Sequence, residues 1–469
     1  YKNVKESTPG AGFKRYTYFY VPYQSNLELP YAPPQPGIST GNLESESSYA
    51  PSGAMKAYTF NSQKSDALTF NTPAGNLFVK AYWGTNGGGS QTGLAKVYSL
   101  GTKPFRLSSV ENNLDGLTTT TQFSYRSDKA HLLPTEIQTT HPDGTVEKQT
   151  FQYAKETNNT SLLTRHMIGI PIKKQRLVNQ VIQGGEWTIY SSFAGFPRPF
   201  LVNRFNPVLN TWETETTFNS YDTWGNPSSL THRGWSPETY TWNQDLLTQK
   251  NYLDFKWQYE YEPNTTLLKK YTEPNGLFTQ YAYDKLSRLR SINQYNGKAT
   301  TTIGYTYSPA NNRIRIATDY QTGADLTTEK VLDGLGRTIR LRKIGYGQGG
   351  QDVVSQTDYD PAGRVKRDYL PGFGAASSAF TEYSYEDSPL SRPISITRPA
   401  PLGMETLTYG NENDHFTQTL TNALGEYTQT FTDTRGRKRS TVQGKDGLLN
   451  TTQYQYDDRN NLLSVLPDG

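Results

Sequence analysis

The feature that most constrains the fold of this chain is a short phrase, Tyr-Asp-x-x-Gly-Arg, that recurs along the sequence in strict and loose forms. An aspartate whose carboxylate accepts a hydrogen bond from a backbone N–H two residues further on begins a chain reversal, and a glycine three residues later adopts the positive φ of a tight turn. Each copy is therefore predicted to form the turn of a β-hairpin. The predicted turn residues are Asp222, Gly225, Asp284, Asp333, Gly336, Asp360, Gly363, Asp433, Gly436 and Asp457.

The residues before each turn alternate with a period of two. Tyr281 and Tyr283 precede one turn, and Tyr454 and Tyr456 precede another. Side chains two residues apart lie on one face of a strand, so these tyrosines are expected to pack on neighbouring repeats. Helical periodicity is weak, and its best candidate is Ser161–Gly169. We therefore predict an all-β chain with at most a turn or two of helix there.

The repeats also predict how the strands assemble. Units of about 20 to 27 residues, each with two strands and two turns, cannot bury an apolar face alone and must stack on their neighbours. Twisted sheets of many strands curl. The predicted fold is an antiparallel β-hairpin ribbon that spirals into a curved surface able to enclose a volume. We expect residues 1–150 to form an N-terminal β-rich part with degenerate repeats, and residues 151–469 to form the main repeat segment.

The charges of the chain are balanced, because 47 basic and 43 acidic residues leave a net charge of +4. Such a balance provides no electrostatic surface for nucleic acid or an anionic membrane. Cysteine is absent, which favours a chain that travels through oxidising or extracellular space without disulfides. The chain begins at Tyr1 rather than Met and has no long apolar run, so we expect a fragment or a processed piece.

Residue types that carry catalysis are dispersed. The five histidines show no metal-ligand spacing, and no Gly-x-Ser-x-Gly motif occurs. Gly345–Gly350 spells the dinucleotide-binding fingerprint, but a strand pattern follows it in place of a helix, so a hairpin loop is the stronger interpretation. A carboxylate pair for glycoside hydrolysis stays open as an alternative, because two such residues can meet from anywhere in the fold. We predict no catalytic residue, no metal and no cofactor.

Tryptophans supply the one candidate ligand-binding set. Exposed aromatic rings can form a sugar-binding face, whereas the same rings can equally pack between strands, which we take as the stronger interpretation. The candidates are Trp212, Trp224, Trp235, Trp242 and Trp257.

The series of Tyr-Asp-x-x-Gly-Arg phrases resembles the RHS/YD-repeat proteins. The stretch from Val331 through Asp333 and Arg337 to Pro371 is similar to the form found in large bacterial surface RHS proteins, and Arg165–Pro171 resembles a segment upstream of it. The resemblance implies a β-ribbon that spirals into a hollow shell. Such a shell encloses a C-terminal effector in bacterial toxins, including Tc-toxin shell subunits, and forms an extracellular adhesion scaffold in teneurin-like animal proteins. Many bacterial members carry a self-cleaving core domain, and no segment of this chain matches it.

We therefore expect a structural shell segment of a secreted or cell-surface bacterial RHS protein, which encloses or presents a C-terminal effector or toxin that lies outside this chain. The alternative is an extracellular adhesion or glycan-binding module. Expected partners are other segments of the same polypeptide, an enclosed effector domain, and secretion machinery or surface glycans. Nucleic-acid binding, membrane insertion and enzymatic activity are not expected.

Overall fold

The computed structural model describes residues 3–7, 12–18, 43–50, 52, 55–65, 77–85, 91–99, 105–127, 131–308, 312–320, 326–445 and 447–468. The strands of the first half are β1 Asn3–Ser7, β2 Phe13–Tyr18, β3 Leu43–Tyr49, β4 Met55–Ser65, β5 Leu77–Thr85, β6 Gln91–Ser99, β7 Phe105–Leu114, β8 Leu117–Tyr125, β9 Pro134–Thr140, β10 Val146–Gln152, β11 Lys173–Val178, β12 Val181–Phe193, β13 Phe196–Asn206, β14 Thr211–Tyr221, β15 Pro227–His232, β16 Glu238–Asn243 and β17 Leu246–Tyr252. Those of the second half are β18 Phe255–Tyr261, β19 Leu268–Thr272, β20 Phe278–Tyr283, β21 Leu289–Gln294, β22 Ala299–Thr306, β23 Asn312–Asp319, β24 Leu326–Leu332, β25 Thr338–Ile344, β26 Val353–Tyr359, β27 Val365–Phe373, β28 Phe380–Tyr385, β29 Pro393–Arg398, β30 Gly403–Glu412, β31 His415–Thr421, β32 Tyr427–Thr432, β33 Lys438–Lys445, β34 Leu448–Tyr456 and β35 Leu462–Pro467. The helical elements are α1 Thr160–Thr164 and the 3-10 turns η1 Tyr295–Gly297 and η2 Gln348–Gly350.

The strands form one long antiparallel ribbon. Within the described residues, each strand pairs with the next one along the chain, except that β4 pairs with β7 and the β5–β6 hairpin makes a separate two-stranded sheet. In the part of the chain that the structure describes, the main sheet has 33 strands. Most connections are hairpins with short turns, so most pairings are local in sequence, and the longer connections join β2 to β3, β4 to β7 and β10 to β11.

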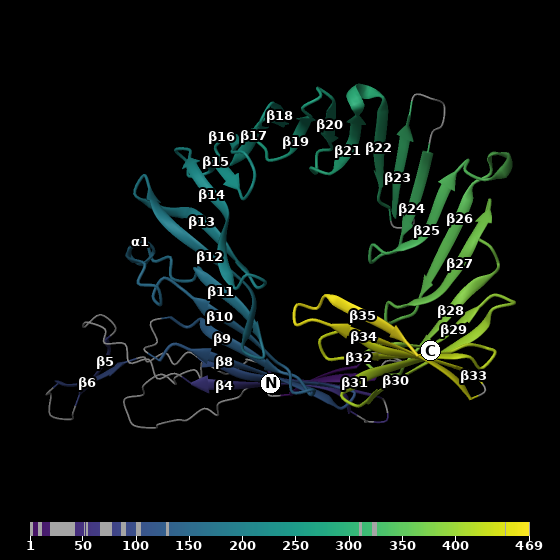
Figure 1. Cartoon of the computed structure of the whole chain (residues 1–469), viewed down its shortest axis with the longest axis horizontal. Coiled ribbons are helices and arrows are strands. Elements are labelled where there is room, and N and C mark those ends of the chain that lie inside the picture. Colours follow the sequence, from purple (N-terminus) through teal and green to yellow (C-terminus); the bar gives the residue numbers. More distant parts are fainter. Residues whose placement is uncertain are drawn as a thin grey trace.

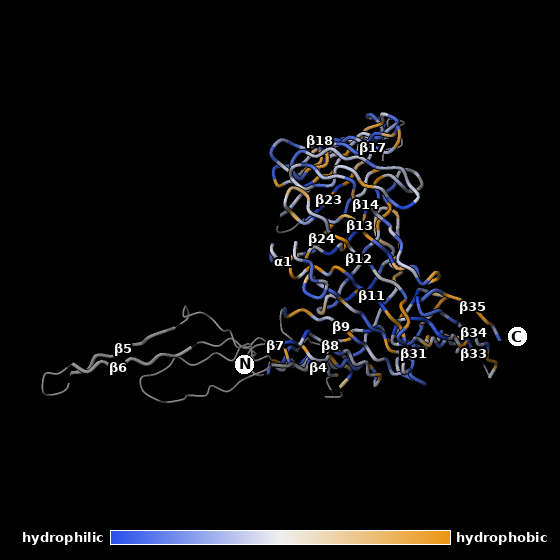
Figure 2. The backbone as a smooth tube through the Cα atoms, turned by 60° about the vertical axis from the view of Figure 1, so that its left-hand side comes forward, coloured by the Kyte–Doolittle hydropathy of each residue, from blue (hydrophilic) through white to orange (hydrophobic). Residues whose placement is uncertain are grey.

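The ribbon curls through a full circuit. Figure 1 shows the strands passing round an open middle, so that β30–β35 return beside β4–β9. Figure 2 shows the same circuit from another side, with β31 and β33–β35 next to the level of β7–β9. The predicted fold class, an all-β antiparallel hairpin ribbon curved into a shell, is confirmed. The curling follows from the right-handed twist that accumulates over many strands.

The two edges of the ribbon have different sets of turns. In an antiparallel meander, turns lie alternately at one edge and the other. We call the edge that carries the turns after even-numbered strands rim A, and the edge that carries the turns after odd-numbered strands from β7 onward rim B. The Tyr-Asp-x-x-Gly-Arg turns at Asp284, Asp333, Asp360 and Asp433 all lie on rim A.

The apolar core is small, because most of the chain is a single layer. One cluster lies where α1 packs on the sheet, and it consists of Ala154, Leu162 and Ile172, with Trp187 packed against them. Asn159 caps α1 through a hydrogen bond from the Leu162 N–H at 3.1 Å. The helix overlaps the predicted stretch 161–169 but ends earlier, because His166 adopts a positive φ of 55°. No helix in the described part of the chain meets the length and apolarity that a membrane crossing requires.

Candidate functional site

Each Tyr-Asp-x-x-Gly-Arg turn on rim A is built around one aspartate. In the turn at Asp333, Oδ1 accepts hydrogen bonds from the backbone N–H groups of Leu335 and Arg337, each at 2.9 Å, and Oδ2 accepts from Arg337 Nε at 2.7 Å. Gly336 has a φ of 82°. The carboxylate therefore satisfies the turn backbone and holds the arginine side chain in one orientation.

The same arrangement recurs at the other predicted turns. The carboxylates of Asp222, Asp284, Asp360, Asp433 and Asp457 each accept from the backbone and side chain of the residue four positions later, and Gly225, Gly363 and Gly436 have φ values of 90°, 86° and 79°. The hydrogen bond from the Arg288 guanidinium, followed by that from its backbone N–H, lowers the pKa of Asp284. These carboxylates are engaged within their own turns.

Two turns lack the glycine and keep the same backbone shape. Ser287 has a φ of 62° and Asn460 a φ of 70°. Asparagine tolerates this region better than serine does. The hydrogen bond from the Ser287 N–H to the Asp284 carbonyl persists at 3.0 Å, so the turn accepts backbone strain without a change of type.

Successive turns on rim A are joined by an arrangement that the alternation of tyrosines did not reveal. The Arg337 guanidinium lies over the ring of Tyr359, 4.2 Å from its centroid, and the Tyr359 hydroxyl donates to the carbonyl of Thr338 at 3.1 Å. Tyr359 stands just before the next rim A turn. We call this contact a turn clasp, and it contributes on the order of 1–3 kcal/mol from the cation–π contact and the hydrogen bond together.

Turn clasps repeat along rim A. The Arg–Tyr pairs with their carbonyl acceptors are Arg106–Tyr125 with Leu107, Arg288–Tyr305 with Leu289, Arg364–Tyr385 with Val365, and Arg392–Tyr409 with Pro393. The tyrosines were expected to pack on neighbouring repeats, and at these sites each packs on an arginine at the start of the preceding strand or in the turn before it. The spacing of Arg and Tyr in the phrase therefore couples one hairpin to the next.

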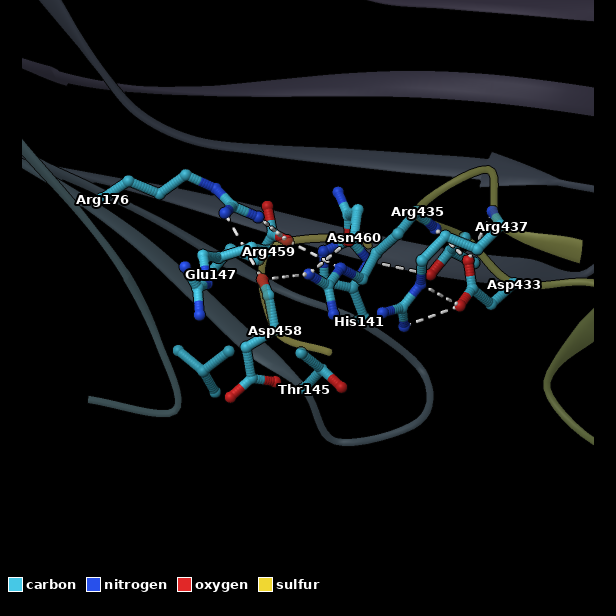
Figure 3. A network of polar contacts seen from close by, with 12 residues as sticks. His141, Thr145, Glu147, Arg176, Asp433, Arg435, Arg437, Asp458, Arg459 and Asn460 are labelled. Atoms are coloured by element: carbon cyan, nitrogen blue, oxygen red, sulfur yellow. Dashed lines mark hydrogen bonds and ion pairs between the residues drawn. The ribbon is translucent and has the colours of Figure 1, made fainter. Parts of the chain in front are cut away.

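The ring closes where rim A of the last strands meets rim B of the first. The turn after β32 carries Arg435, whose side chain is only 4% exposed and whose Nε lies 2.7 Å from Glu147 Oε1 on β10 (Figure 3). Arg176 on β11 also contacts Glu147 Oε1, at 3.0 Å. Both arginines donate to the Asp458 carbonyl, at 3.2 Å from Arg435 and 3.4 Å from Arg176. The Glu147 carboxylate and the Asp458 carbonyl thus each bind both Arg176 and Arg435, which lie far apart in the sequence.

A second group of contacts extends this closure. Arg392, in the turn after β28, forms an ion pair with Asp115 in the β7–β8 turn and another with Glu386 at 2.8 Å. Asn411 donates to the backbone carbonyl of Asp115. We call the whole set of contacts, from Asp115 to Arg176 on rim B and from Glu386 to Asn460 on rim A, the closure seam. Its polar groups bridge segments that the strand ladder does not connect.

Acidification is expected to weaken the closure seam through His141. This side chain is 8% exposed, and its Nδ1 lies 2.8 Å from Thr434 Oγ1. Burial lowers the pKa of His141 even though Asp143, Glu147 and Asp433 lie near it. The folded chain therefore binds this proton less readily than the unfolded chain, in which a histidine titrates near about 6.5.

The sign of the effect follows from that difference. The contribution of His141 to the free energy of unfolding is fully present above about pH 6.5. It falls as the pH drops below that value, by at most about 1.4 kcal/mol per pH unit for one proton. Urea unfolding of the wild type at pH 7 and pH 5.5 should show a loss of stability that His141→Gln reduces and that His415→Gln, on β31, leaves in place. Equal pH dependence in all three proteins would contradict this role of His141.

The five tryptophans do not assemble into one surface. Trp212 packs edge-on against Trp187 and Phe205, with centroid distances of 6.1 and 5.4 Å. Trp224 and Trp235 are 64% and 57% exposed, but they lie at opposite ends of β15, on rim A and rim B. A six-residue strand separates such ends by about 20 Å. Trp242 donates to the Pro227 carbonyl at 2.8 Å. The fifth, Trp257, lies on β18 with the Lys250 ammonium 5.5 Å from its ring centroid.

The histidines, the carboxylates and the glycine-rich loop were the remaining candidates for chemistry. In the residues that the structure describes, no three His, Asp or Glu side chains gather as metal ligands would. The loop 345–350 connects β25 to β26, contains η2, and is followed by a strand. Its glycines Gly345, Gly349 and Gly350 have φ values of 67°, 70° and 74°. The loop therefore reverses the ribbon and does not begin an α-helix.

No protein-family model matches the chain. The tRNA nuclease WapA of Bacillus subtilis strain 168 is 27% identical over 116 residues, which cover 25% of this chain and 5% of that protein. The tRNA3(Ser)-specific nuclease WapA of Bacillus spizizenii matches with the same identity and coverage. The chain therefore spans only a small part of the curated relatives that it matches.

Solved structures match nearly the whole chain. The crystal structure of TcdB2-TccC3 superposes with a TM-score of 0.64 and 11% identity, covering 98% of this chain and 32% of that one. The Photorhabdus luminescens Tc holotoxin pore gives a TM-score of 0.67 with 10% identity, covering 97% and 33%. The chain has an RHS-like shell fold, and it spans about a third of the length of these Tc toxin chains.

Proposed function

We propose that this chain is a wall segment of a secreted or surface-exposed bacterial RHS shell, which encloses or presents an effector domain of the same polypeptide. The observation that carries the proposal is the closure seam. An open ribbon needs no contact between its ends, whereas Arg435 and Arg392 are held across the seam by Glu147 and Asp115. The likeness to the Tc toxin chains supports the same assignment.

The proposal assigns the chain no reaction of its own. The aspartates of the turn phrase are engaged by the side chain of the residue four positions later, as Arg337 engages Asp333 and Arg364 engages Asp360. The nuclease activity in the name of WapA belongs to a protein of which this chain matches 5%. The segments 1–150 and 151–469 are proposed to be two parts of one wall, with β10 spanning the boundary between them.

Containment is tested with a tethered cargo. An unfolded reporter peptide is joined after residue 469, and its digestion by a nonspecific protease is followed in the wild type and in Arg435→Ala, the variant in which the seam should open. The proposal expects digestion at least about tenfold slower in the closed ring. Equal digestion in the two proteins, with the wall itself intact, would argue against enclosure by this segment.

The alternative is an adhesion or glycan-binding module. Trp224 and Trp235 are the exposed rings of the predicted set. A glycan array with the wild type and with Trp224→Ala and Trp235→Ala separates the two functions: binding that either substitution abolishes favours adhesion, and no binding favours the wall.

A further inference from the structure

The residue types at the turns of both rims differ between the turns that the closure seam covers and those that it leaves uncovered. At the position before the positive-φ residue, the covered rim A turn after β32 carries Arg435, which is buried in the closure seam. Three uncovered rim A turns carry large apolar residues at the same position, where Trp224, Leu286 and Leu335 are 64%, 72% and 79% exposed, and the β26–β27 turn carries Ala362 there.

Rim B shows the same division. Its covered turns present polar groups, such as Asp115 and His141, to the closing strands. Six of the turns that follow, between β11–β12 and β25–β26, present large apolar side chains that are at least 53% exposed, and the β19–β20 turn does not. The exposed side chains are Val181, Val208, Leu209, Trp235, Leu253, Tyr295 and Tyr346. Rim B of the last strands continues the row with Leu402, Leu424 and Leu448, which are 65%, 72% and 80% exposed.

Rows of exposed apolar side chains of this size mark an interaction surface. Scattered apolar residues on a surface are ordinary, but here they recur at several turns of both rims and are replaced by charged and polar groups where the seam covers the rim. The apolar row on rim B also begins beside the seam, since Arg176 makes a seam contact on β11 and Val181 begins β12. The uncovered rim is therefore continuous with an interface that the fold already makes.

We propose that rim B of one copy of this chain docks on rim A of a second copy, in the same polarity as the closure seam. Within one chain, the closure seam already places rim A of the last strands on rim B of the first. In the proposed contact, the uncovered apolar part of rim A of a second copy packs in the same way on the uncovered apolar part of rim B of the first copy. Such a contact is head-to-tail, with different surfaces on the two partners, and it generates a stack of coils rather than a closed dimer. Docking of the rims does not depend on whether the ring encloses a cargo.

Complementary variants test the proposal in the intact chain. The rim A variant carries Trp224→Lys, Leu286→Lys and Leu335→Lys, and the rim B variant carries Leu209→Lys, Leu253→Lys and Leu424→Lys. All six positions are at least 61% exposed, so the variants should keep the circular dichroism spectrum and thermal midpoint of the wild type.

Sedimentation velocity over a range of concentrations gives the readout. We expect the wild type to form growing stacks and each variant alone to associate at least about tenfold more weakly. An equimolar mixture of the two variants should form a one-to-one dimer and stop there, because one intact rim A and one intact rim B remain between them. Lysines on both variants exclude attraction between added opposite charges as the cause.

A second control addresses the edge strand. β35 carries the exposed side chains Leu463 and Val465, at 65% and 48%, and copies could instead pair through it. Leu463→Lys with Val465→Lys should leave the stacking unchanged. A wild type that stays monomeric, a mixture that fails to dimerise, or stacking that only the β35 variant removes would each overturn the proposal.

Discussion

Replacing Arg435 by alanine is expected to open the ring. The Arg435 side chain is 4% exposed and contacts Glu147, the Asp458 carbonyl and the Asn460 side chain, the last at 2.9 Å. Removing it leaves Glu147 with Arg176 alone. Because Glu147 is 27% exposed and keeps Arg176, losing Arg435 should cost about 1–3 kcal/mol, which the seam cannot recover because no described strand ladder crosses it.

Two measurements report the opening of the ring. Small-angle X-ray scattering should show a larger radius of gyration for Arg435→Ala, and the backbone amides of the β9–β10 turn should exchange hydrogen faster. Arg290→Ala, an exposed position of β21, serves as the control. In a double-mutant cycle, Glu147→Gln should cost at least about 1 kcal/mol less in the Arg435→Ala background than in the wild type. Additive effects, or an unchanged radius of gyration, would show that Arg435 does not hold the seam.

Replacing Gly336 by valine is expected to destabilise the chain by about 1–3 kcal/mol, the cost of forcing a branched side chain into a positive-φ conformation. Gly336 has a φ of 82°, and a Cβ there would meet no atom within 4 Å. The loss would therefore come from backbone strain and not from crowding. The strained turn should also shift Arg337 away from Tyr359 and loosen their clasp.

The same turn supplies a matched control. Gly334 lies two residues earlier, is not among the positive-φ glycines, and a Cβ there would also meet no atom within 4 Å. Gly334→Val should change the free energy of unfolding by no more than about 0.5 kcal/mol. Urea unfolding of the two variants decides the matter: equal losses would mean that the positive φ is not what requires glycine at position 336.

The turns of this fold and the hairpin ribbon that they form could be predicted from the sequence. The phrase around Asp333 and Gly336 contains its own hydrogen-bond partners within four residues, so its turn geometry depends on nothing else in the chain. The hairpin ribbon followed from the repetition of that turn. The early end of α1 could not be foreseen, because the positive φ of His166 is a property of the packed loop and not of the helical pattern.

Contacts between repeats could not be predicted from the sequence pattern, because they depend on how the strands are arranged in space. The pairing of Arg337 with Tyr359 needs the strand register, which places a residue at the start of β25 beside the end of β26. The pairing of Arg435 with Glu147 needs the curvature of the entire sheet. A small error in twist per strand, summed over 33 strands, would place those two residues far apart. Sequence reasoning therefore found the residues of the turns but not those of the closure seam.

The nearest-neighbour pairing of the strands sets an order of folding. Ladder contacts have short sequence separations, so hairpins can form one after another as the chain emerges, each on the edge left by the previous one. The seam contacts are of the opposite kind, since His141 and Thr434 are 293 residues apart and Arg392 and Asp115 are 277 apart. Loop-closure entropy places them last. In a chain that stopped before β32, all the preceding strands could pair, but the Arg435 contacts could not form. These contacts therefore form only after nearly all of the strands are in place.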